Sequence, residues 1–418
     1  MNDTQLYTQL LGIETPWSVT GVELNSDIQE VLVRVEILQR GLLFSCPECG
    51  ESCALHDHRE ERRWRHLDSC GFSTFLLARV PRINCHEHGV KTINVPWSSP
   101  HSRFTRAFES FAIAVLQSTM VQSKAAALLG LSNAQIFELM HRAVMRGMER
   151  RQQDGSRTAP AHLALDEKSF RKGHNYISVL TDSDGQRVLD VEEGRTLDAS
   201  KCLIKKALSP SERDGVRSIT MDMWRAFMGA ASELLPQADL IHDRFHVAKY
   251  LNDAVDRTRR AEHRELNAAD DTTSPLNRTK YLWLSNPENL SPARRALLDA
   301  VRENDLLTSK AWAYKESFRE FFTAESVAEA RTFFVNWTQF AQELGCKPLT
   351  KVALMLEDHL DGLLNYHRHH KTNATAEGVN SQIQRLKANA RGFRRFENFR
   401  IAILFFLGKL DLSPQTFS

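Results

Sequence analysis

Two groups of residues have types and spacings that suit chemistry, and the first is a cluster of cysteines. Cys46-Pro47-Glu48-Cys49-Gly50 places two thiols three positions apart, and Cys85-His86-Glu87-His88-Gly89 repeats the spacing with an imidazole in the last place. Such pairs bind one tetrahedral Zn²⁺, and a following glycine permits the tight turn. The sequence therefore predicts a closed structural zinc site formed by Cys46, Cys49, Cys85 and His88.

The alternative is a set of free, partly buried thiols with histidines at the surface. Five of the seven cysteines fall between Cys46 and Cys85, and the N-terminus has no cationic lead-in of a signal peptide. Clustering of this kind in an intracellular chain favours metal binding over disulfides. Weaker candidates for the ligand set are Cys53, Cys70, His56, His58 and His86.

The second group consists of three carboxylates. Asp166 follows the apolar run His162–Leu165, Asp222 follows Ile219–Met221, and both runs are predicted strands. Side-chain alternation puts Lys168 on the face of Asp166. If the two strands are neighbours, both aspartates lie at one rim of a sheet. Glu377 lies on a predicted helix over 374–389, whose apolar stripe of Val379, Ile383 and Leu386 would dock on the sheet.

Three acids gathered at one rim repel each other, so such a cluster normally binds hard cations. Two Mg²⁺ ions, with Mn²⁺ as a substitute, can generate a hydroxide and stabilise the leaving oxygen of a phosphodiester. The alternative for each acid is a solvated surface group. Another polar segment should begin beside the same rim, His242-Asp243-Arg244-Phe245-His246. Its Asp243 and His246 would support the site or contact DNA rather than bind an ion.

The elements that must position these residues fall into six segments. Composition changes predict a lead-in over 1–40, a zinc-binding module over 41–96 and a helical DNA-binding domain over 101–152, each separated by polar or proline-rich breaks. A strand–hairpin–strand–helix–strand–helix–strand order over 160–246 predicts an α/β core with a mixed sheet. A helical insertion over 247–373 and final core helices over 374–418 complete the chain, which is therefore multidomain, α+β and α/β.

Gln122–Leu139 fits a helix-turn-helix. Ala126 is small where the helices cross, Gly130 lies in the turn, and Ile136 is the apolar plug. Ser132 and Gln135 form a capping box for the second helix. That helix would present Asn133, Gln135 and Arg142 to a major groove; the alternative is two ordinary packed helices. Further cations that could neutralise phosphates are Lys168, His246, Arg391, Arg394 and Arg395.

Composition limits the class of protein. Lys plus Arg is 54 against 52 for Asp plus Glu, so the net charge is only +2 and a uniformly basic coat is excluded. Apolar residues are 42% of the chain, but the longest apolar run, Ile401–Leu407, is far shorter than the ~20 residues of a membrane span. A soluble, cytoplasmic protein without a membrane partner is expected.

The chain resembles bacterial insertion-sequence transposases of the IS-L-three family. The residues that carry the resemblance are Cys46–Gly50, Leu165-Asp166-Glu167-Lys168-Ser169, Met221-Asp222-Met223, Asp243-Arg244-Phe245-His246 and Ala376-Glu377-Gly378-Val379-Asn380. It implies a ribonuclease-H-like fold with Asp166, Asp222 and Glu377 as a metal-binding DDE triad. The 155 positions from Asp222 to Glu377 require the helical insertion. His88 departs from the family pattern, which usually ends in a cysteine.

The resemblance also implies a mechanism. The zinc module and helix-turn-helix would bind the terminal inverted repeats of the element, and the triad would hold two Mg²⁺ for strand cleavage and transfer to target DNA. Joining two ends implies a homodimer on DNA, at the nucleoid of a bacterial cell. The competing hypotheses are a catalytically silent DNA-binding regulator and a structure-selective nuclease of the same fold; a zinc hydrolase fits least.

Overall fold

The chain forms two compact units. The computed structural model describes residues 2–154, 159–171, 173, 175–269, 274–371 and 374–414. Unit 1 contains residues 1–154 and 410–418, and unit 2 contains residues 155–409. The predicted break over 152–160 falls at this boundary, and its residues 155–158 lie outside the described ones. Within these ranges no helix combines the length and apolar character needed to cross a bilayer.

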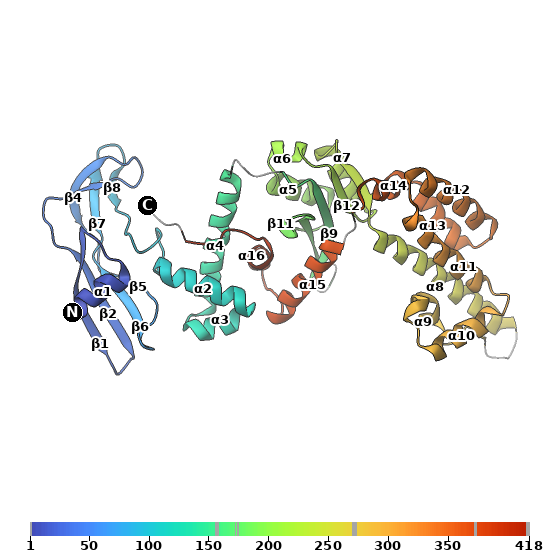
Figure 1. Ribbon diagram of the computed structural model, residues 1–418, viewed down its shortest axis with the longest axis horizontal. Helices are drawn as coiled ribbons and strands as arrows, with labels where there is room; N and C mark the ends of the chain where they lie inside the picture. Colours follow the sequence, from blue (N-terminus) through green and yellow to red (C-terminus); the bar gives the residue numbers. More distant parts are fainter. Residues whose placement is uncertain are drawn as a thin grey trace. The chain divides into compact units, whose positions relative to one another are not determined.

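Unit 1 begins with two four-stranded sheets (Figure 1). The first has the order β1-β2-β6-β5 and the second β3-β4-β7-β8. Strand β2 pairs in parallel with β6, so the first forty residues, predicted as a separate lead-in, share a sheet with later strands. Trp97 packs edge-on against Trp17 and Trp64 in the core of this sheet. The bounds are α1 Asp3–Leu11, β1 Trp17–Asn25, β2 Glu30–Ile37, β3 Leu43–Ser45, β4 Ser52–His58, β5 Arg62–Arg65, β6 Ser73–Ala78, β7 Pro81–Cys85 and β8 Gly89–Thr92.

Three helices follow: α2 (Arg106–Thr119), α3 (Gln122–Leu129) and α4 (Asn133–Gln153). Gly130 ends α3 with φ of +62°, a conformation that favours glycine. Ser132 and Gln135 form the predicted capping box at the start of α4. Ile136 is fully buried and Ala126 nearly so. The local features predicted around the turn are therefore present.

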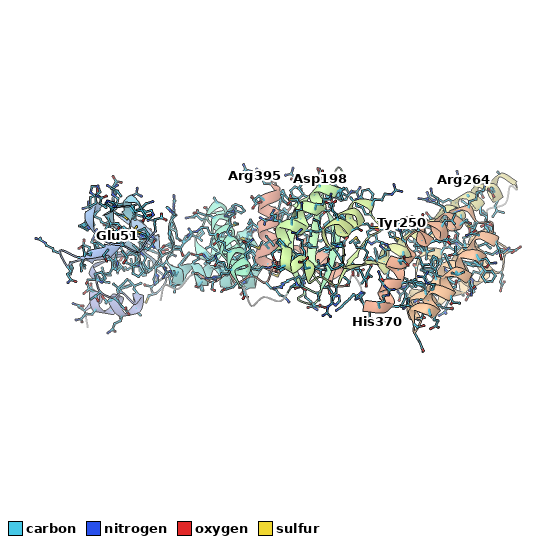
Figure 2. The ribbon with its side chains drawn as sticks, turned by 90° about the horizontal axis from the view of Figure 1, so that it is seen from above. Glu51, Asp198, Tyr250, Arg264, His370 and Arg395 are labelled. Carbon is cyan, nitrogen blue, oxygen red and sulfur yellow. The ribbon has the colours of Figure 1, made fainter. Side chains whose placement is uncertain are left out.

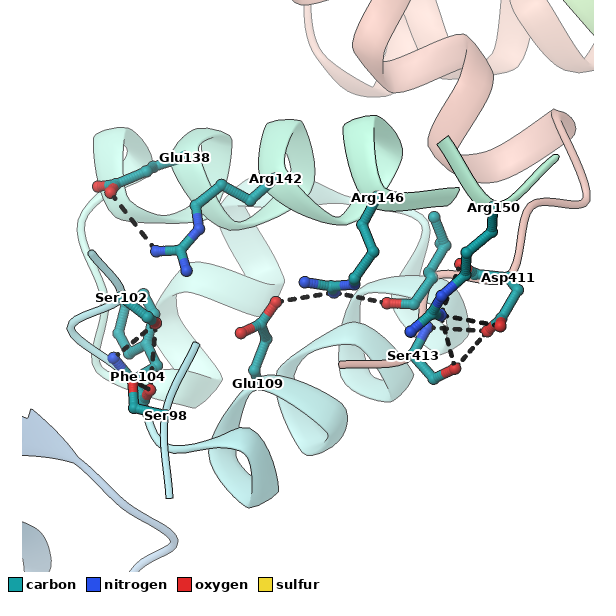
Figure 3. Close-up of polar contacts among 11 residues, drawn as sticks. Ser98, Ser102, Phe104, Glu109, Glu138, Arg142, Arg146, Arg150, Asp411 and Ser413 are labelled. Carbon is teal, nitrogen blue, oxygen red and sulfur yellow. Dashed lines mark hydrogen bonds and ion pairs between the residues drawn. The ribbon is translucent and has the colours of Figure 1, made fainter. Parts of the chain in front are cut away.

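The C-terminal tail, residues 410–414, packs against α4 (Figure 3). The Arg146 guanidinium donates to the Leu412 carbonyl at 2.7 Å and to the buried Glu109 carboxylate of α2 at 2.8 Å. Arg150 pairs with Asp411 at 2.8 Å and donates to Ser413 Oγ at 3.2 Å. A Cβ on Gly147 would lie 2.8 Å from Leu410 Cβ, so only glycine lets the tail approach this closely.

Unit 2 contains a five-stranded mixed sheet of order β11-β10-β9-β12-β13. Strand β9 is antiparallel to β10 and parallel to β12, and β12 is parallel to β13. The strand expected to end at Asp166 runs on to Arg171, because Lys168 and Ser169 pair with Ile177 and Tyr176 of β10. The bounds are β9 His162–Arg171, β10 Asn175–Asp182, β11 Arg187–Glu193, β12 Ser218–Met221 and β13 Asp239–His242.

Helices flank this sheet. Side chains from α5 and α7 form one apolar core with the sheet, while α15 packs on β9 and α16 on β11. Val379, Ile383 and Leu386 of α15 are buried, as the predicted apolar stripe requires. Arg400 of α16 is also buried, in an ion pair with Asp190 at 2.7 Å, so it does not belong to an exposed basic surface. The bounds are α5 Leu197–Ala207, α6 Pro210–Asp214, α7 Arg225–Leu234, α15 Ala374–Asn389 and α16 Phe396–Leu407.

The segment between β13 and α15 is helical throughout its described part (Figure 1). It has its own apolar core, in which Trp283, Phe318, Phe321 and Phe334 are almost fully buried. Helix α14 joins this core to the sheet, since Asn365 donates to the Leu240 carbonyl of β13. The bounds are α8 Arg244–Ala269, α9 Lys280–Leu284, η1 Pro287–Asn289, α10 Pro292–Arg302, α11 Leu307–Ser317, η2 Phe318–Thr323, α12 Val327–Glu343, α13 Lys347–Glu357 and α14 Leu360–His369.

Candidate metal centres and catalytic site

Two tight turns bring four soft ligands together in unit 1. Cys46 follows β3, and its carbonyl accepts a hydrogen bond from Gly50, whose φ is +76°. Cys85 ends β7 and pairs with Gly89 across the hairpin to β8. Backbone hydrogen bonding at Cys49, the largest cause, lowers the pKa of the Cys46 thiol to about 7, which favours a thiolate.

The distances in this cluster fit a zinc ion. The ligand atoms of Cys46, Cys49, Cys85 and His88 all lie within 4.8 Å of one another. Cys49 and Cys85 sulfurs are 3.7 Å apart, and His88 Nδ1 lies 3.6 Å from the Cys85 sulfur. Tetrahedral Zn²⁺ with bonds of ~2.3 Å to sulfur would separate two sulfurs by roughly 3.8 Å. The residues present therefore match a Cys₃His donor set.

The other cysteines and histidines of this module are placed differently. Cys53 of β4 is buried, and its sulfur lies in a second group with Glu51 and Cys85 that shares the Cys85 ligand atom. Glu51 is labelled in Figure 2. Cys70 is exposed, and in the described part of the chain it belongs to neither group, nor do His56, His58 and His86.

In unit 2, Asp166 lies in the middle of β9 and contacts α15. The Asn380 amide donates to Asp166 Oδ2 at 2.5 Å, and the Glu167 backbone N–H donates to Oδ1 at 2.7 Å. Burial raises the pKa of Asp166, and the two hydrogen bonds oppose that rise. Asn380 is buried against the strand although its side chain is polar. This contact fixes the helix that carries Glu377 on the strand that carries Asp166.

Asp222 follows β12, the strand next to β9, and faces His246. His246 Nε2 lies 3.6 Å from Asp222 Oδ2, and its Nδ1 lies 2.9 Å from Asp243 Oδ2. Burial opposes a charge on His246, but the Asp243 hydrogen bond and the negative charge of Asp222 raise the pKa of the imidazole above its usual value. The carboxylates of Asp166 and Asp243 also act on this ring, so the four side chains share one site.

Glu377 is exposed on the first turn of α15, one turn before Asn380. Residues three apart on a helix share a face. Among the described residues, the ligand atoms of Asp166, Asp222 and Glu377 do not form a group within 4.8 Å. Three carboxylates without a cation repel, so a separation of this kind is expected of them.

His242 has a different environment. It is buried against Gly362 and His359 of the helical segment, and burial lowers its pKa to about 4. His242 and His246, four positions apart, do not form a metal-binding pair, because the two imidazoles lie in separate surroundings.

An aromatic and cationic group beside Asp222 escaped the sequence analysis. Arg195 pairs with both Glu167 oxygens at 2.9 and 3.0 Å, and its guanidinium stacks on Tyr176 and Trp224. Trp224 lies two residues after Asp222 and is 41% exposed. Arg195 lies between β11 and α5 and belongs to no motif, so its position just after a strand was the sequence signal that could have identified it.

The predicted DNA-contacting residues are mostly accessible. Asn133 is exposed, whereas the Gln135 side chain is used by the helix cap and Arg142 lies 4.0 Å from Glu138. Lys168 and His246 are half-buried near the acids. Arg391, Arg394 and Arg395 are exposed between α15 and α16, and Arg395 is labelled in Figure 2. Phe399 is core, stacked on Phe170 and Phe393.

Two aspartates on adjacent strands of a mixed sheet, a helix that carries a glutamate and is bonded to one of them, and a separate Cys/His cluster are the features expected of a DNA-cleaving enzyme of the DDE class. Comparison with known proteins agrees. Residues 163–403 match the ISL3-type DDE transposase family, described as a transposase, and residues 43–88 match the zinc-finger of transposase IS204/IS1001/IS1096/IS1165. The chain belongs to the IS-L-three family of transposases.

Curated relatives cover most of the chain. The transposase for insertion sequence element IS1001 of Bordetella parapertussis is 26% identical over 367 residues, covering 86% of this chain and 87% of that protein. The transposase for insertion sequence element IS1557 of Mycobacterium tuberculosis is 24% identical over 427 residues, covering 94% and 93%. The resemblance inferred from the motifs is confirmed, and the chain is a transposase with a zinc-ribbon domain.

Proposed function

We propose that Asp166, Asp222 and Glu377 bind two Mg²⁺ ions and that the enzyme cuts its element ends and joins them to target DNA. The sheet order and strand directions support a ribonuclease-H-like core, in which the segment from α8 to α14 is an insertion. Carboxylate oxygens are the donors that Mg²⁺ and Mn²⁺ prefer. When bound, the ions activate water and neutralise charge on the phosphodiester.

The observation that carries this proposal is the 2.5 Å hydrogen bond between Asn380 and Asp166. It joins two residues 214 positions apart and sets α15 on β9. Because Glu377 lies one turn from Asn380, its carboxylate is carried by the helix that contacts Asp166. No nucleophilic serine, cysteine or tyrosine is required.

The residues of this chain then act in two ways. His246, held by Asp243, orients the Asp222 carboxylate at the rim that a phosphate of the DNA would approach. Lys168, on the Asp166 face of β9, and the exposed arginines 391, 394 and 395 neutralise the phosphates of the bound strand.

In unit 1, Asn133 and Arg142 on α4 read base edges in the major groove of the terminal inverted repeats, and Gln135 completes the cap of that helix. Cys46, Cys49, Cys85 and His88 hold a structural Zn²⁺. Joining two ends at once calls for a homodimer on DNA, in the cytoplasm where the nucleoid lies.

The test separates binding from cleavage. Asp166→Asn and Glu377→Gln should bind end DNA within ~3-fold of wild type in a mobility-shift assay but lose at least ~1,000-fold in Mg²⁺-dependent nicking, because each removes a metal ligand. Glu233→Gln, an exposed acid of α7, is the matched control and should cut normally. Cleavage by Asp166→Asn at the wild-type rate would disprove the assignment. End binding without any wild-type cleavage would favour the regulator instead.

A further inference from the structure

A cavity of about 330 Å³ lies in the helical segment of unit 2, between the first turns of α8 and the residues around η2. Its volume is within the ~300–1,000 Å³ range of pockets that bind small molecules. Val247 and Leu251 of α8 and Phe318 and Phe322 of η2 give it apolar and aromatic walls. The proposed chemistry of the carboxylates uses none of these residues.

The cavity and the acids lie on opposite faces of α8. Successive residues of a helix are turned by about 100°, so Leu251 and Ala248 lie roughly 140° and 200° round from His246. His246 faces Asp222, and Tyr250, labelled in Figure 2, faces the same way: burial raises its pKa first, and the charge of Asp222 adds to the rise. A ligand in the cavity would therefore be separated from the metal-binding carboxylates by the thickness of a helix.

One polar atom in the cavity wall calls for a partner. Asn252 Oδ1 is shielded from solvent and, within the part of the chain that the structure describes, accepts no hydrogen bond. An unsatisfied buried acceptor destabilises the folded chain, and a ligand that donates a hydrogen bond to it would remove this cost. A carboxamide offers a donor and an acceptor side by side, the pattern that matches the N6 and N7 edge of adenine. The phenylalanine walls suit a flat aromatic base.

The charges at the cavity indicate an anion beside that base. Its lining carries three cations, Arg244, Lys315 and Arg319, against one carboxylate, Glu316. Lys315 is buried and already bonded to the Trp283 carbonyl and to Glu316, and Arg319 pairs with Glu288 and Glu316. Arg244 is exposed, stacks on Phe322, and makes no ion pair with any described carboxylate. It is the side chain free to bind a phosphate.

We propose that this cavity is a binding site for a free adenine mononucleotide, with the base between α8 and Phe322, its N6–N7 edge on Asn252 and its phosphate on Arg244. This site does not depend on the proposed cleavage reaction. It binds its ligand without Mg²⁺, and Asp166→Asn leaves its affinity unchanged.

The experiment is calorimetric titration of the full chain with AMP, adenosine and GMP in Mg²⁺-free buffer. AMP should bind more tightly than GMP. Asn252→Leu should weaken AMP binding by ~10-fold or more and remove the preference for adenine, since one bidentate base contact is worth ~1–3 kcal/mol. Arg244→Gln should weaken AMP but not adenosine. Lys249→Gln, which removes an exposed cation of α8 outside the cavity, is the control and should bind as wild type.

Both variants change accessible or half-buried side chains, and circular dichroism at 222 nm verifies that α8 remains folded. The proposal is overturned if wild type does not bind AMP, if AMP and GMP bind equally, or if both variants bind AMP normally. It is also overturned if only a single-stranded oligo-dA binds and depends on Asn252, because the site would then take a base from DNA.

Discussion

Replacement of Arg146 by methionine should open the helical part of unit 1. Glu109 is 2% exposed and pairs with the Arg146 guanidinium at 2.8 Å, while its second oxygen has no partner among the described residues (Figure 3). Removing one partner of a buried ion pair costs about 3–5 kcal/mol, because the remaining charge stays buried and unpaired. The bond to the Leu412 carbonyl is lost as well, which releases the tail.

The assay is native-state hydrogen exchange with mass spectrometry, because it reports on unit 1 separately from unit 2. Amides of α2 and α4 should exchange on the order of 100- to 4,000-fold faster in Arg146→Met, since 1.4 kcal/mol corresponds to tenfold. Peptides from the sheet of unit 2 should not change. Arg142→Met is the matched control: it lies one turn earlier on α4 and has only a 4.0 Å contact with Glu138, so its effect should stay within ~0.5 kcal/mol.

A double variant tests the physical reason. Glu109→Leu together with Arg146→Met replaces the ion pair by apolar side chains, so most of the lost protection should return. If the double variant exchanges as fast as Arg146→Met alone, the unpaired charge is not the cause. Exchange of α2 and α4 at the wild-type rate in Arg146→Met would refute the reasoning altogether.

Three other perturbations test separate parts of unit 1. Gly147→Ala should cost ~1–3 kcal/mol and raise exchange of residues 410–414, because the new Cβ meets Leu410; unchanged protection of the tail would contradict this. Cys49→Ala should lower the zinc content measured by atomic absorption to below half an equivalent, whereas His88→Cys should keep one zinc per chain. Burial lowers the pKa of His66 to about 4, so the folded chain stays neutral there while the unfolded chain binds a proton below about 6.5. The contribution of His66 to the free energy of unfolding should therefore be constant above that pH and fall by up to about 3 kcal/mol toward pH 4. In urea unfolding, His66→Gln should lack this part of the decline.

Features that depend on neighbours in the sequence were predictable. The turn at Gly130 and the cap at Ser132 follow from the backbone freedom of glycine and from a hydroxyl three residues before a glutamine. The cysteine spacing likewise predicts two tight metal-binding turns, because the chain must reverse within four residues to bring both ligands of a pair to one ion. In each case the decisive contact lies within one turn of the chain.

Features that depend on distant contacts were predicted less well. The charged run Asp166-Glu167-Lys168 suggested the end of a strand, yet β9 continues because β10 supplies its hydrogen bonds. Residues 374–418 were expected to form the final core helices, and the described end of that segment, residues 410–414, groups with unit 1. That grouping rests on Gly147 and Arg146, more than 260 positions away from the tail, and no local pattern in residues 410–414 indicates it.

In the carboxylate site, helix α15 has one feature that its own sequence predicts and another that depends on a distant contact. The stripe of Val379, Ile383 and Leu386 predicts that α15 docks on the sheet, but periodicity alone does not say which strand receives it. The hydrogen bond from Asn380 to Asp166, 2.5 Å long, identifies β9 as that strand and shows which part of β9 the helix contacts. A single exposed glutamate has no distinguishing pattern, so Glu377 was predicted from its place on the helix with the apolar stripe together with the family resemblance. Its position one turn from Asn380 puts it on the helix that contacts Asp166, and Glu377→Gln tests whether its carboxylate takes part in cleavage.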